Sequence, residues 1–324
     1  MKSRIINGWQ RLWSIVLAGG EGERMRPMVK RWLGQHRPKQ YCTFVGTRSM
    51  FQHTFDRAAQ LTPPSRIVTV SAAHHQADVL SQLEKRDGGT VLMQPRNCDT
   101  APGIYLPLSF IRAQDPRATV LVHPSDHFVH PEPRFLEAAQ RAVRAAEQLS
   151  DRLVLLAAVP DHAEPEYGWI EPGPPLAWVS GYPVRTVRRF LEKPPVEQAE
   201  RIFAAGALWS TLVLAAKVET LWTIGWHCLP EMMPLFEQLQ AAWGTADECR
   251  VLERSYRQMP ARNFSLGLLE QFPDRVAVIE MDGVVWSDWG KPERIAETLQ
   301  RIERPPAFPL TLCGSGTSSE EGDS

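Results

Sequence analysis

The chain has 324 residues, of which 43% are hydrophobic and 23% are charged, and its formal net charge is −1. This length can bury the core of one large domain, and the composition is that of an ordinary globular protein. The near-zero charge gives no overall field to attract nucleic acid or a membrane surface. No apolar run approaches the length of about 18 residues that indicates a membrane-spanning helix.

Cysteine usage indicates the compartment. The five cysteines are scattered and odd in number, and no two form a Cys-x-x-Cys pair: Cys42, Cys98, Cys228, Cys249 and Cys313. This pattern argues against a zinc site and against a disulfide framework. We therefore expect a reducing compartment, with a cytoplasmic location, and we interpret residues 1–12 as a leader without the continuous apolar region of a signal peptide.

The first strong pattern is a short apolar run at residues 13–17, typical of a buried strand, followed by a glycine-rich loop. Gly19, Gly20 and Gly22 let backbone N–H groups approach an anion, and Arg24 can grip phosphate with its guanidinium group. A strand-ending turn with solvated arginines is the alternative. A dinucleotide fingerprint fits less well because a third glycine is missing at its expected position.

Charge is uneven near this loop. Residues 1–48 hold ten Lys or Arg residues against two acids, a local balance of 10 − 2 = +8. This excess favours a polyanionic small ligand, although a solvated basic face would look the same. Residues 28–38 form a basic segment that we expect to be a long irregular loop with a function.

Strands and helices alternate through the first half of the chain. Strands are expected at residues 66–70, 90–93, 119–122, 153–159, 167–173, 184–191, 208–215 and 276–280. Helices are expected at 49–61, 74–86, 100–113, 132–149 and 195–205, over most of 217–257, and in a last segment ending near 303. The alternation predicts an α/β fold with a mainly parallel sheet, and the strands at 167–173 and 184–191 predict a small antiparallel insertion. Residues 304–324 are expected to be a disordered tail.

Two strand ends carry polar residues, and ligands of such sheets bind beyond the carboxyl ends of the strands. Asp126 follows the strand at 119–122, where it could hold Mg²⁺ together with substrate oxygens, and Asp288 could complete the site. Each aspartate alone could instead be a helix cap. His123 and His127 give only a weak metal signal. Lys39 and Lys193, each next to a proline, could place a point charge on phosphate or be merely solvated.

Seven motifs then occur in order: LAGGEGERMRP (17–27), PKQY (38–41), QPRNCDTAP (94–102), PSDHF (124–128), YGWIEPG (167–173), FLEKP (190–194) and SDWGKPERI (287–295). In this order they resemble the sugar-1-phosphate nucleotidyltransferases, and most of all the mannose-1-phosphate guanylyltransferases. The resemblance covers residues 13–303. It implies a GT-A-like, Rossmann-like nucleotidyltransferase domain with a nucleotide half at about 13–150 and a sugar-phosphate half at about 151–303.

The resemblance also implies a reaction, in which an NTP, expected to be GTP, and a sugar 1-phosphate, expected to be mannose 1-phosphate, give an NDP-sugar and pyrophosphate. The implied catalytic residues are Arg24, Lys39 and Asp126, with Asp126 and Asp288 as Mg²⁺ ligands. The implied nucleotide-binding residues are Leu17, Ala18, Gly19, Gly20, Gly22, Gln94, Asn97, Thr100 and Ala101. The implied sugar-phosphate residues are Gly168, Glu192, Lys193, Trp209 and Ser210. A homodimer is compatible with the same resemblance.

Some residues depart from the family pattern. Glu23 places an acid beside the expected triphosphate, and Cys98 with Asp99 interrupts the Arg-Asn-Thr-Ala-Pro pattern. The family's Trp-Asn-(Ser/Ala)-Gly segment, whose Asn meets the sugar, reads Trp-Ser-Thr-Leu at residues 209–212, so Leu212 in place of the glycine should crowd a close approach of the backbone. Two alternatives follow: a non-catalytic relative that binds nucleotide or sugar nucleotide and regulates a partner, and a transferase with a non-sugar acceptor. The length of the chain and its later motifs argue against the second.

Overall fold

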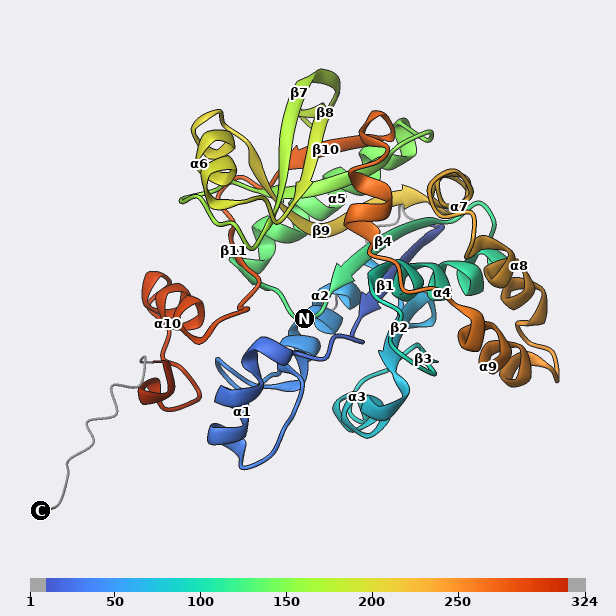
Figure 1. The fold of residues 1–324 in the computed structure, drawn as a ribbon, viewed down its shortest axis with the longest axis horizontal. Coiled ribbons are helices and arrows are strands. Elements are labelled where there is room, and N and C mark those ends of the chain that lie inside the picture. The colour runs from blue at the N-terminus through green and yellow to red at the C-terminus, as the bar shows by residue number, and fades with distance from the viewer. Residues whose placement is uncertain (1–9, 314–324) are drawn as a thin grey trace, which may run out of the picture.

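A computed structural model describes residues 10–313 of the chain. Within these residues, one sheet of nine strands has the order β3-β2-β1-β4-β9-β6-β10-β8-β7, and β5 with β11 forms a small second sheet (Figure 1). The strands are β1 (Leu12–Leu17), β2 (Ile67–Ala72), β3 (Thr90–Gln94), β4 (Thr119–Pro124), β5 (Phe128–His130), β6 (Leu153–Ala158), β7 (Gly168–Val179), β8 (Tyr182–Glu192), β9 (Leu208–Lys217), β10 (Val276–Glu280) and β11 (Val285–Ser287).

The sheet is mixed, and most of its strands run in one direction. Strands β3, β2, β1 and β4 pair in parallel, as do β6 and β10, whereas β8 and β9 run against their neighbours. The long hairpin of β7 and β8 is the predicted antiparallel insertion (Figure 1). Because β1 and β4 are adjacent and parallel, the segments that follow Leu17 and Pro124 emerge at the same edge of the sheet.

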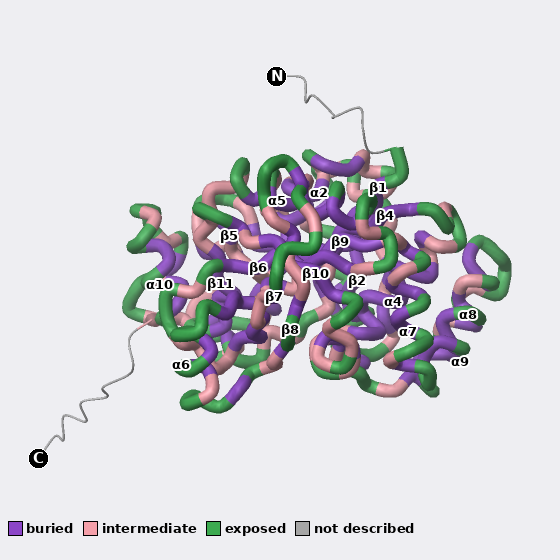
Figure 2. The backbone as a smooth tube through the Cα atoms, turned by 90° about the horizontal axis from the view of Figure 1, so that it is seen from above, coloured by how far each residue is buried: buried purple, intermediate pink, exposed green. Residues whose placement is uncertain are grey.

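Ten helices accompany the sheet in the described part of the chain: α1 (Arg26–Leu33), α2 (Met50–Leu61), α3 (Gln76–Leu83), α4 (Thr100–Gln114), α5 (Glu132–Gln148), α6 (Val196–Ala204), α7 (Val218–Cys228), α8 (Met233–Ala242), α9 (Glu248–Gln258) and α10 (Pro292–Arg301). Helices α4 and α7 cover one face, and α2 and α5 cover the other, so the sheet lies buried between them (Figure 2). No described helix is long and apolar enough to span a bilayer.

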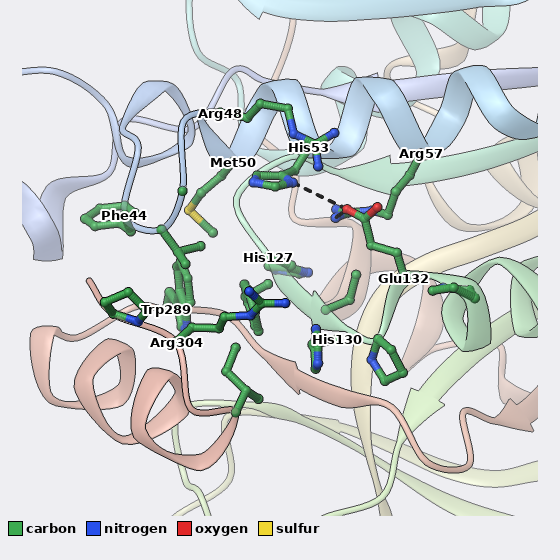
Figure 3. Close-up of a pocket in the computed structure, with 18 residues that line it drawn as sticks. Phe44, Arg48, Met50, His53, Arg57, His127, His130, Glu132, Trp289 and Arg304 are labelled. Carbon is green, nitrogen blue, oxygen red and sulfur yellow. Dashed lines mark hydrogen bonds and ion pairs between the residues drawn. The ribbon is translucent and has the colours of Figure 1, made fainter. Parts of the chain in front are cut away.

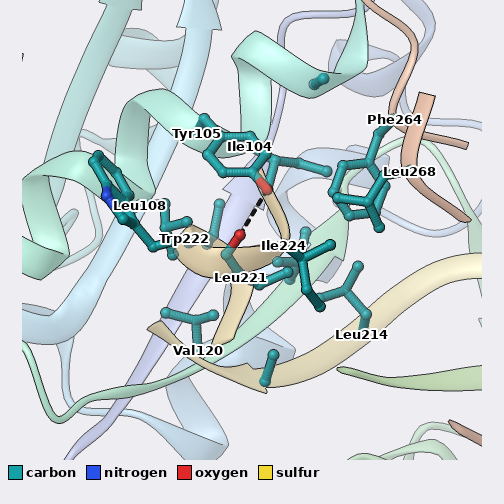
Figure 4. Packing of buried hydrophobic residues seen from close by; sticks show 14 of the residues in the cluster. Ile104, Tyr105, Leu108, Val120, Leu214, Leu221, Trp222, Ile224, Phe264 and Leu268 are labelled. Carbon is teal, nitrogen blue, oxygen red and sulfur yellow. Dashed lines mark hydrogen bonds between the residues drawn. The ribbon is translucent and has the colours of Figure 1, made fainter. Parts of the chain in front are cut away.

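The largest core lies on the α4 face (Figure 4). The hydroxyl of Tyr105 donates a 2.7 Å hydrogen bond to the carbonyl oxygen of Leu221, so its polar end is satisfied inside the apolar layer. Helix α2 begins as its sequence predicts, because Ser49 and Gln52 form a reciprocal capping box. These local signals explain why helix boundaries in the first half lie close to their predicted positions.

Two predicted segments differ from the structure at their edges. Residues 28–33 of the expected irregular loop belong to helix α1, in which Pro27 occupies the first turn and Gly34 ends the helix with φ +73°. Its apolar residues Met28, Val29 and Trp32 pack inward. The helix was not predicted because its three basic residues gave the segment a composition typical of a loop. Leu12, expected in the leader, is a buried residue of β1.

Residues 304–313 are not a disordered tail. The backbone N–H of Ala307 donates to the carbonyl oxygen of Phe44 at 2.9 Å, and Phe308 packs against Trp32 and Phe44. One aromatic side chain therefore anchors a proline-rich segment onto α1 and α10. The remainder of the expected tail, residues 314–324, and residues 1–9 of the expected leader lie outside the described residues.

Candidate active site

The glycine loop after β1 is held by the segment that contains Lys39. The side-chain amide of Gln40 donates to the carbonyl oxygens of Ala18 at 3.0 Å and Gly20 at 2.8 Å. Gly22 has φ +64°, and a Cβ there would lie 2.9 Å from the backbone nitrogen of Lys39. Glycine is therefore required at this position for both conformation and space, and the close approach brings Lys39 to the loop.

Four predicted residues meet at the shared strand edge, and we call Arg24, Lys39, Asp126 and Asp288 the ionic cluster. The Lys39 ammonium lies 3.1 Å from Asp126 Oδ2 and donates to the carbonyl oxygen of Asp288 at 2.5 Å. The Arg24 guanidinium donates to Asp288 Oδ2 at 2.9 Å. Lys39 is almost completely buried, whereas the side chain of Asp126 is 39% exposed. The ionic cluster therefore combines a partly exposed carboxylate, that of Asp126, with a buried cation, that of Lys39.

Asp288 is fixed by three further donors, of which Tyr167 is distant in the sequence and the other two are near it. Its Oδ1 accepts hydrogen bonds from the Tyr167 hydroxyl at 3.1 Å, from the Gly290 N–H at 2.8 Å and from Arg294 at 2.9 Å. Glu166 binds Arg24 from the other side at 2.9 Å. Each cation of the cluster is thus balanced by carboxylates from distant parts of the chain.

Both aspartates are ionised. Burial alone would raise the pKa of Asp126, but Lys39 and His127 outweigh it and hold this pKa below its ordinary value. For Asp288, burial is again opposed by Lys39 and then by Arg294, and its pKa lies well below its ordinary range. Ionised carboxylate oxygens beside the glycine loop are suited to bind a hard divalent cation.

A second group of predicted residues lines one pocket of about 560 Å³ beside the glycine loop. Its walls include the predicted Leu17, Gly19, Gly20, Gln94, Asn97 and Thr100, together with Val70, Asp99 and Gly103, which were not predicted. Ala18 and Ala101 are buried behind this pocket: the carbonyl oxygen of Ala18 accepts from the Tyr41 hydroxyl, and the N–H of Ala101 donates to the carbonyl oxygen of Arg262. We call this the loop pocket.

The expected sugar-phosphate residues divide into two sets. Gly168, paired with Glu192 across β7 and β8, lies so close that a Cβ would be 2.9 Å from Glu192 Oε2 and 3.2 Å from the Cβ of Ser210. Lys193 follows with φ +49° and donates its N–H to the carbonyl oxygen of Tyr167. Tyr167 therefore joins this set to the ionic cluster, since its hydroxyl binds Asp288.

The ring of Trp209 does not join that set. It is 4% exposed and packs edge-on against Tyr167 and Trp169, in the core on the α5 face of the sheet. Adjacent strand residues point to opposite faces, so Trp209 and Ser210 cannot both face the same ligand. Leu212 adopts φ +54°, a value that glycine favours, so the expected crowding takes the form of backbone strain while its side chain packs on the main core.

Glu23, the acid that departs from the family pattern, is exposed and forms an ion pair. Its side chain is 63% exposed and its carboxylate pairs with Arg26 at 2.7 Å, so its charge is partly neutralised. The residues that sequence reasoning missed are Asp99, Glu166, Tyr167, Gly290 and Arg294. All of them except Glu166 lie within motifs that the sequence displays, but a motif alone does not show which side chains contact one another.

Another cavity, of about 450 Å³, lies between α2 and the β5 segment (Figure 3). It is lined by apolar residues such as Phe44 and Trp289 and by basic side chains, among them Arg48 and Arg304. Glu132 accepts from His53 within it at 3.4 Å. Its lining holds none of the residues expected to bind nucleotide or sugar, so the candidate active site is the ionic cluster with the loop pocket.

The close packing at Gly290 gives a prediction for stability. A Cβ there would lie 2.5 Å from both Arg24 Nη2 and Asp288 Oδ2. We expect Gly290→Ala to lower the free energy of unfolding by about 1–3 kcal/mol, because overpacking must displace an ion pair. Chemical denaturation measures this. Gly20→Ala is the matched control, since nothing lies within 4 Å of its Cβ position, and an equal loss in both variants would contradict the packing shown here.

Comparison with known proteins identifies the family of the chain. The model of the family described as "Nucleotidyl transferase" matches residues 13–304. The chain is 27% identical over 282 residues to a mannose-1-phosphate guanylyltransferase of Escherichia coli, and the match covers 85% of this chain and 59% of the relative. It is 28% identical to the enzyme of that name from Klebsiella pneumoniae, with coverage of 90% and 61%. The chain thus spans about three-fifths of the length of these relatives.

Solved structures show the same fold. A protein of Thermus thermophilus titled mannose-1-phosphate geranyltransferase superimposes with a TM-score of 0.77 at 26% identity, covering 90% of this chain and 79% of that one. A protein of Helicobacter pylori titled mannose-6-phosphate isomerase superimposes with a TM-score of 0.67 at 20% identity, covering 86% and 99%. The match over residues 13–304 and the ordered motifs lead to one conclusion: this chain belongs to the nucleotidyl transferase family.

Proposed function

We propose that the chain transfers a nucleotidyl group from GTP to mannose 1-phosphate and releases pyrophosphate. The observation that carries this proposal is the ionic cluster, with its two cations and two carboxylates, held beside the glycine loop whose residues Gly19 and Gly20 line the loop pocket. The names of the E. coli and K. pneumoniae relatives support the choice of base and sugar. This chain, a member of the family, contains the sequence motifs of both the nucleotide half and the sugar-phosphate half.

The proposed reaction needs positioning and charge more than proton transfer. An oxygen of the sugar phosphate attacks the α-phosphorus, and the bond between the α- and β-phosphates breaks to release pyrophosphate. The attacking oxygen is already anionic at neutral pH, so no general base is required. Arg24 would stabilise the departing pyrophosphate, Lys39 the α-phosphate, and Lys193 the sugar phosphate. Such fixed cations supply most of the stabilisation in phosphoryl-type transfers.

Mg²⁺ is the cofactor expected with these substrates. The two aspartates of the ionic cluster fit it, on the condition that Arg24 releases Asp288. Asp126 Oδ1 is approached only by His127 Nε2 at 3.6 Å among the described side chains, so it is free to bind a cation. Asp288 Oδ2 is shared with Arg24 and becomes free when that guanidinium turns toward a polyphosphate. Asp126 and Asp288 would hold the ion, which would neutralise phosphate charge when bound.

The loop pocket presents hydrogen-bond acceptors, and this supports guanine as the base. Gln94 donates its Nε2 to Tyr256 at 3.1 Å, so its Oε1 faces the glycine side, 3.2 Å from a Cβ at Gly19. Asp99 uses Oδ1 to accept from Thr100 and Asn263, and its Oδ2 has no donor among the described residues. Guanine offers N1–H and N2–H₂ as donors to such a wall.

We therefore expect Asp99→Asn to weaken selection for GTP. The substitution keeps the helix cap but replaces a free acceptor oxygen by a donor. The ratio of kcat/KM for GTP over ATP should fall by about tenfold, which corresponds to about 1.4 kcal/mol, the lower part of the range for base discrimination. Competition between the two nucleotides measures this ratio. Asp87→Asn, in the loop before β3, is the control, and an unchanged ratio in Asp99→Asn would remove Asp99 from base recognition.

Nucleotide binding is tested by thermal unfolding with GTP, ATP, UTP, CTP and dTTP, each with and without Mg²⁺. A ligand at a hundredfold excess over its Kd stabilises the native state by about 2.7 kcal/mol, which is a measurable shift. We expect the largest shift with GTP and Mg²⁺. Equal shifts with every nucleotide would contradict the choice of guanine, and no shift with any of them would contradict the proposed nucleotide site.

A further inference from the structure

Three side chains beside the glycine loop converge on one point outside the ionic cluster. Glu21 lies between Gly20 and Gly22 of the loop, and His74 and His75 precede helix α3. His74 Nε2 lies 3.1 Å and His75 Nε2 lies 3.6 Å from the same atom, Glu21 Oε2. One potential ligand atom from each residue lies within 4.8 Å of the other two, so the three can surround a single ion.

The spacing of these ligand atoms is compatible with a tetrahedral metal ion. Zinc binds histidine nitrogen and carboxylate oxygen at about 2.0–2.1 Å, so two ligands of one tetrahedral ion lie about 3.3 Å apart. The two measured separations, 3.1 and 3.6 Å, bracket that value. Two imidazoles and one carboxylate also form the donor set of known three-ligand zinc sites, in which water takes the fourth position.

His75 is the buried imidazole of this cluster. His75 is 5% exposed at its side chain, and its Nδ1 is buried without a hydrogen-bond partner among the described residues. Burial lowers the pKa of His75 below its ordinary value, and His74 lowers it further.

We propose that Glu21, His74 and His75 form a binding site for a transition-metal ion of the zinc class, separate from the Mg²⁺ site. The ion would link the glycine loop to the turn that precedes α3, and these two segments are far apart in the sequence. Binding would also neutralise Glu21, an acid within the loop that surrounds the expected triphosphate. The site would therefore fix the loop in the conformation shown here.

Cobalt binding to the complete, untagged chain tests this site without nucleotide or Mg²⁺. Co²⁺ is the probe, because a tetrahedral cobalt ion has intense visible absorption and an octahedral hydrated one does not. We expect one cobalt per chain with tetrahedral absorption, displaced by one equivalent of Zn²⁺. Glu21→Gln and His74→Ala should each raise the Kd for cobalt by more than about tenfold, the least that loss of a supporting group costs at such sites.

His162→Ala is the matched control, because His162 is an exposed imidazole beside two acids, Asp161 at 2.6 Å and Glu164 at 3.6 Å, with no second imidazole described beside it. This control should bind cobalt as the unchanged chain does. His74 is 57% exposed at its side chain, so its replacement leaves the fold intact. Absence of tetrahedral absorption in the unchanged chain, or absorption that survives both test substitutions, would overturn the proposal.

Discussion

Asp126→Asn is expected to reduce kcat for nucleotidyl transfer by about a thousandfold, equivalent to about 4 kcal/mol of transition-state stabilisation. The substitution keeps the shape of the side chain but removes the charged oxygen that is free to bind a cation. The fold should be retained, because Asp126 is 39% exposed and Lys39 keeps its hydrogen bond to the carbonyl oxygen of Asp288. Pyrophosphate release at saturating substrates measures the rate, and circular dichroism checks the fold.

The control for this variant is Asp151→Asn. Asp151 is a carboxylate that is 56% exposed and pairs with Arg275 at 2.9 Å, far from the ionic cluster, so its loss should leave kcat unchanged. Raising the Mg²⁺ concentration should not restore Asp126→Asn to full activity. Near-normal turnover in this variant would show that the ion binds elsewhere, and a collapse of both variants would point to a general sensitivity to carboxylate loss.

Lys39→Met is expected to lower kcat/KM by about 10²–10³-fold, the usual cost of removing one preorganised charge from a transition state. Methionine fills a similar volume with no charge, and Lys39 is only 6% exposed, so packing changes little. The same substitution removes the cation that lowers the pKa of both Asp126 and Asp288, and both pKa values should rise. Initial rates as a function of pH measure both effects.

The sign of the pH effect follows from the protonation state. In the unchanged chain the pKa values of both carboxyls lie below their ordinary range, so they stay ionised as the pH falls toward about 5. In Lys39→Met the carboxyls should protonate at higher pH, so activity should fall earlier on the acid side. Lys217→Met, at a partly exposed lysine paired with Glu147, is the control. An unshifted acid limb in Lys39→Met would mean that Lys39 does not govern these carboxyls.

Local sequence patterns were sufficient for most elements of the fold. Ser49 and the apolar spacing behind it predicted α2, and the run at 276–280 predicted β10 with its observed bounds. The position of β9 was not predictable in this way. Strand β9 lies antiparallel between β4 and β6. Its length and its sequence pattern would fit a strand at the edge of the sheet equally well. Strand order depends on long-range pairing, which a local pattern does not record.

The site shows the same division. Asp126 and the glycine loop were identifiable because each follows a buried strand whose carboxyl end forms the sheet edge. Tyr167 and Arg294 were not, because a motif does not show the side-chain orientations in the folded chain that direct both residues to donate to Asp288. Trp209 shows the converse: it lies in a recognisable position, but the strand directs its ring into the core.

The most direct test of the proposed function is steady-state pyrophosphate release with Mg²⁺, five nucleoside triphosphates and a panel of sugar 1-phosphates. The proposal predicts turnover that requires both substrates and Mg²⁺ and is fastest with GTP and mannose 1-phosphate. Fast turnover with another pair would contradict the chosen base or sugar and retain the reaction. No turnover with any pair, in a protein that still binds nucleotide, would contradict the transfer reaction and favour a non-catalytic, nucleotide-binding relative.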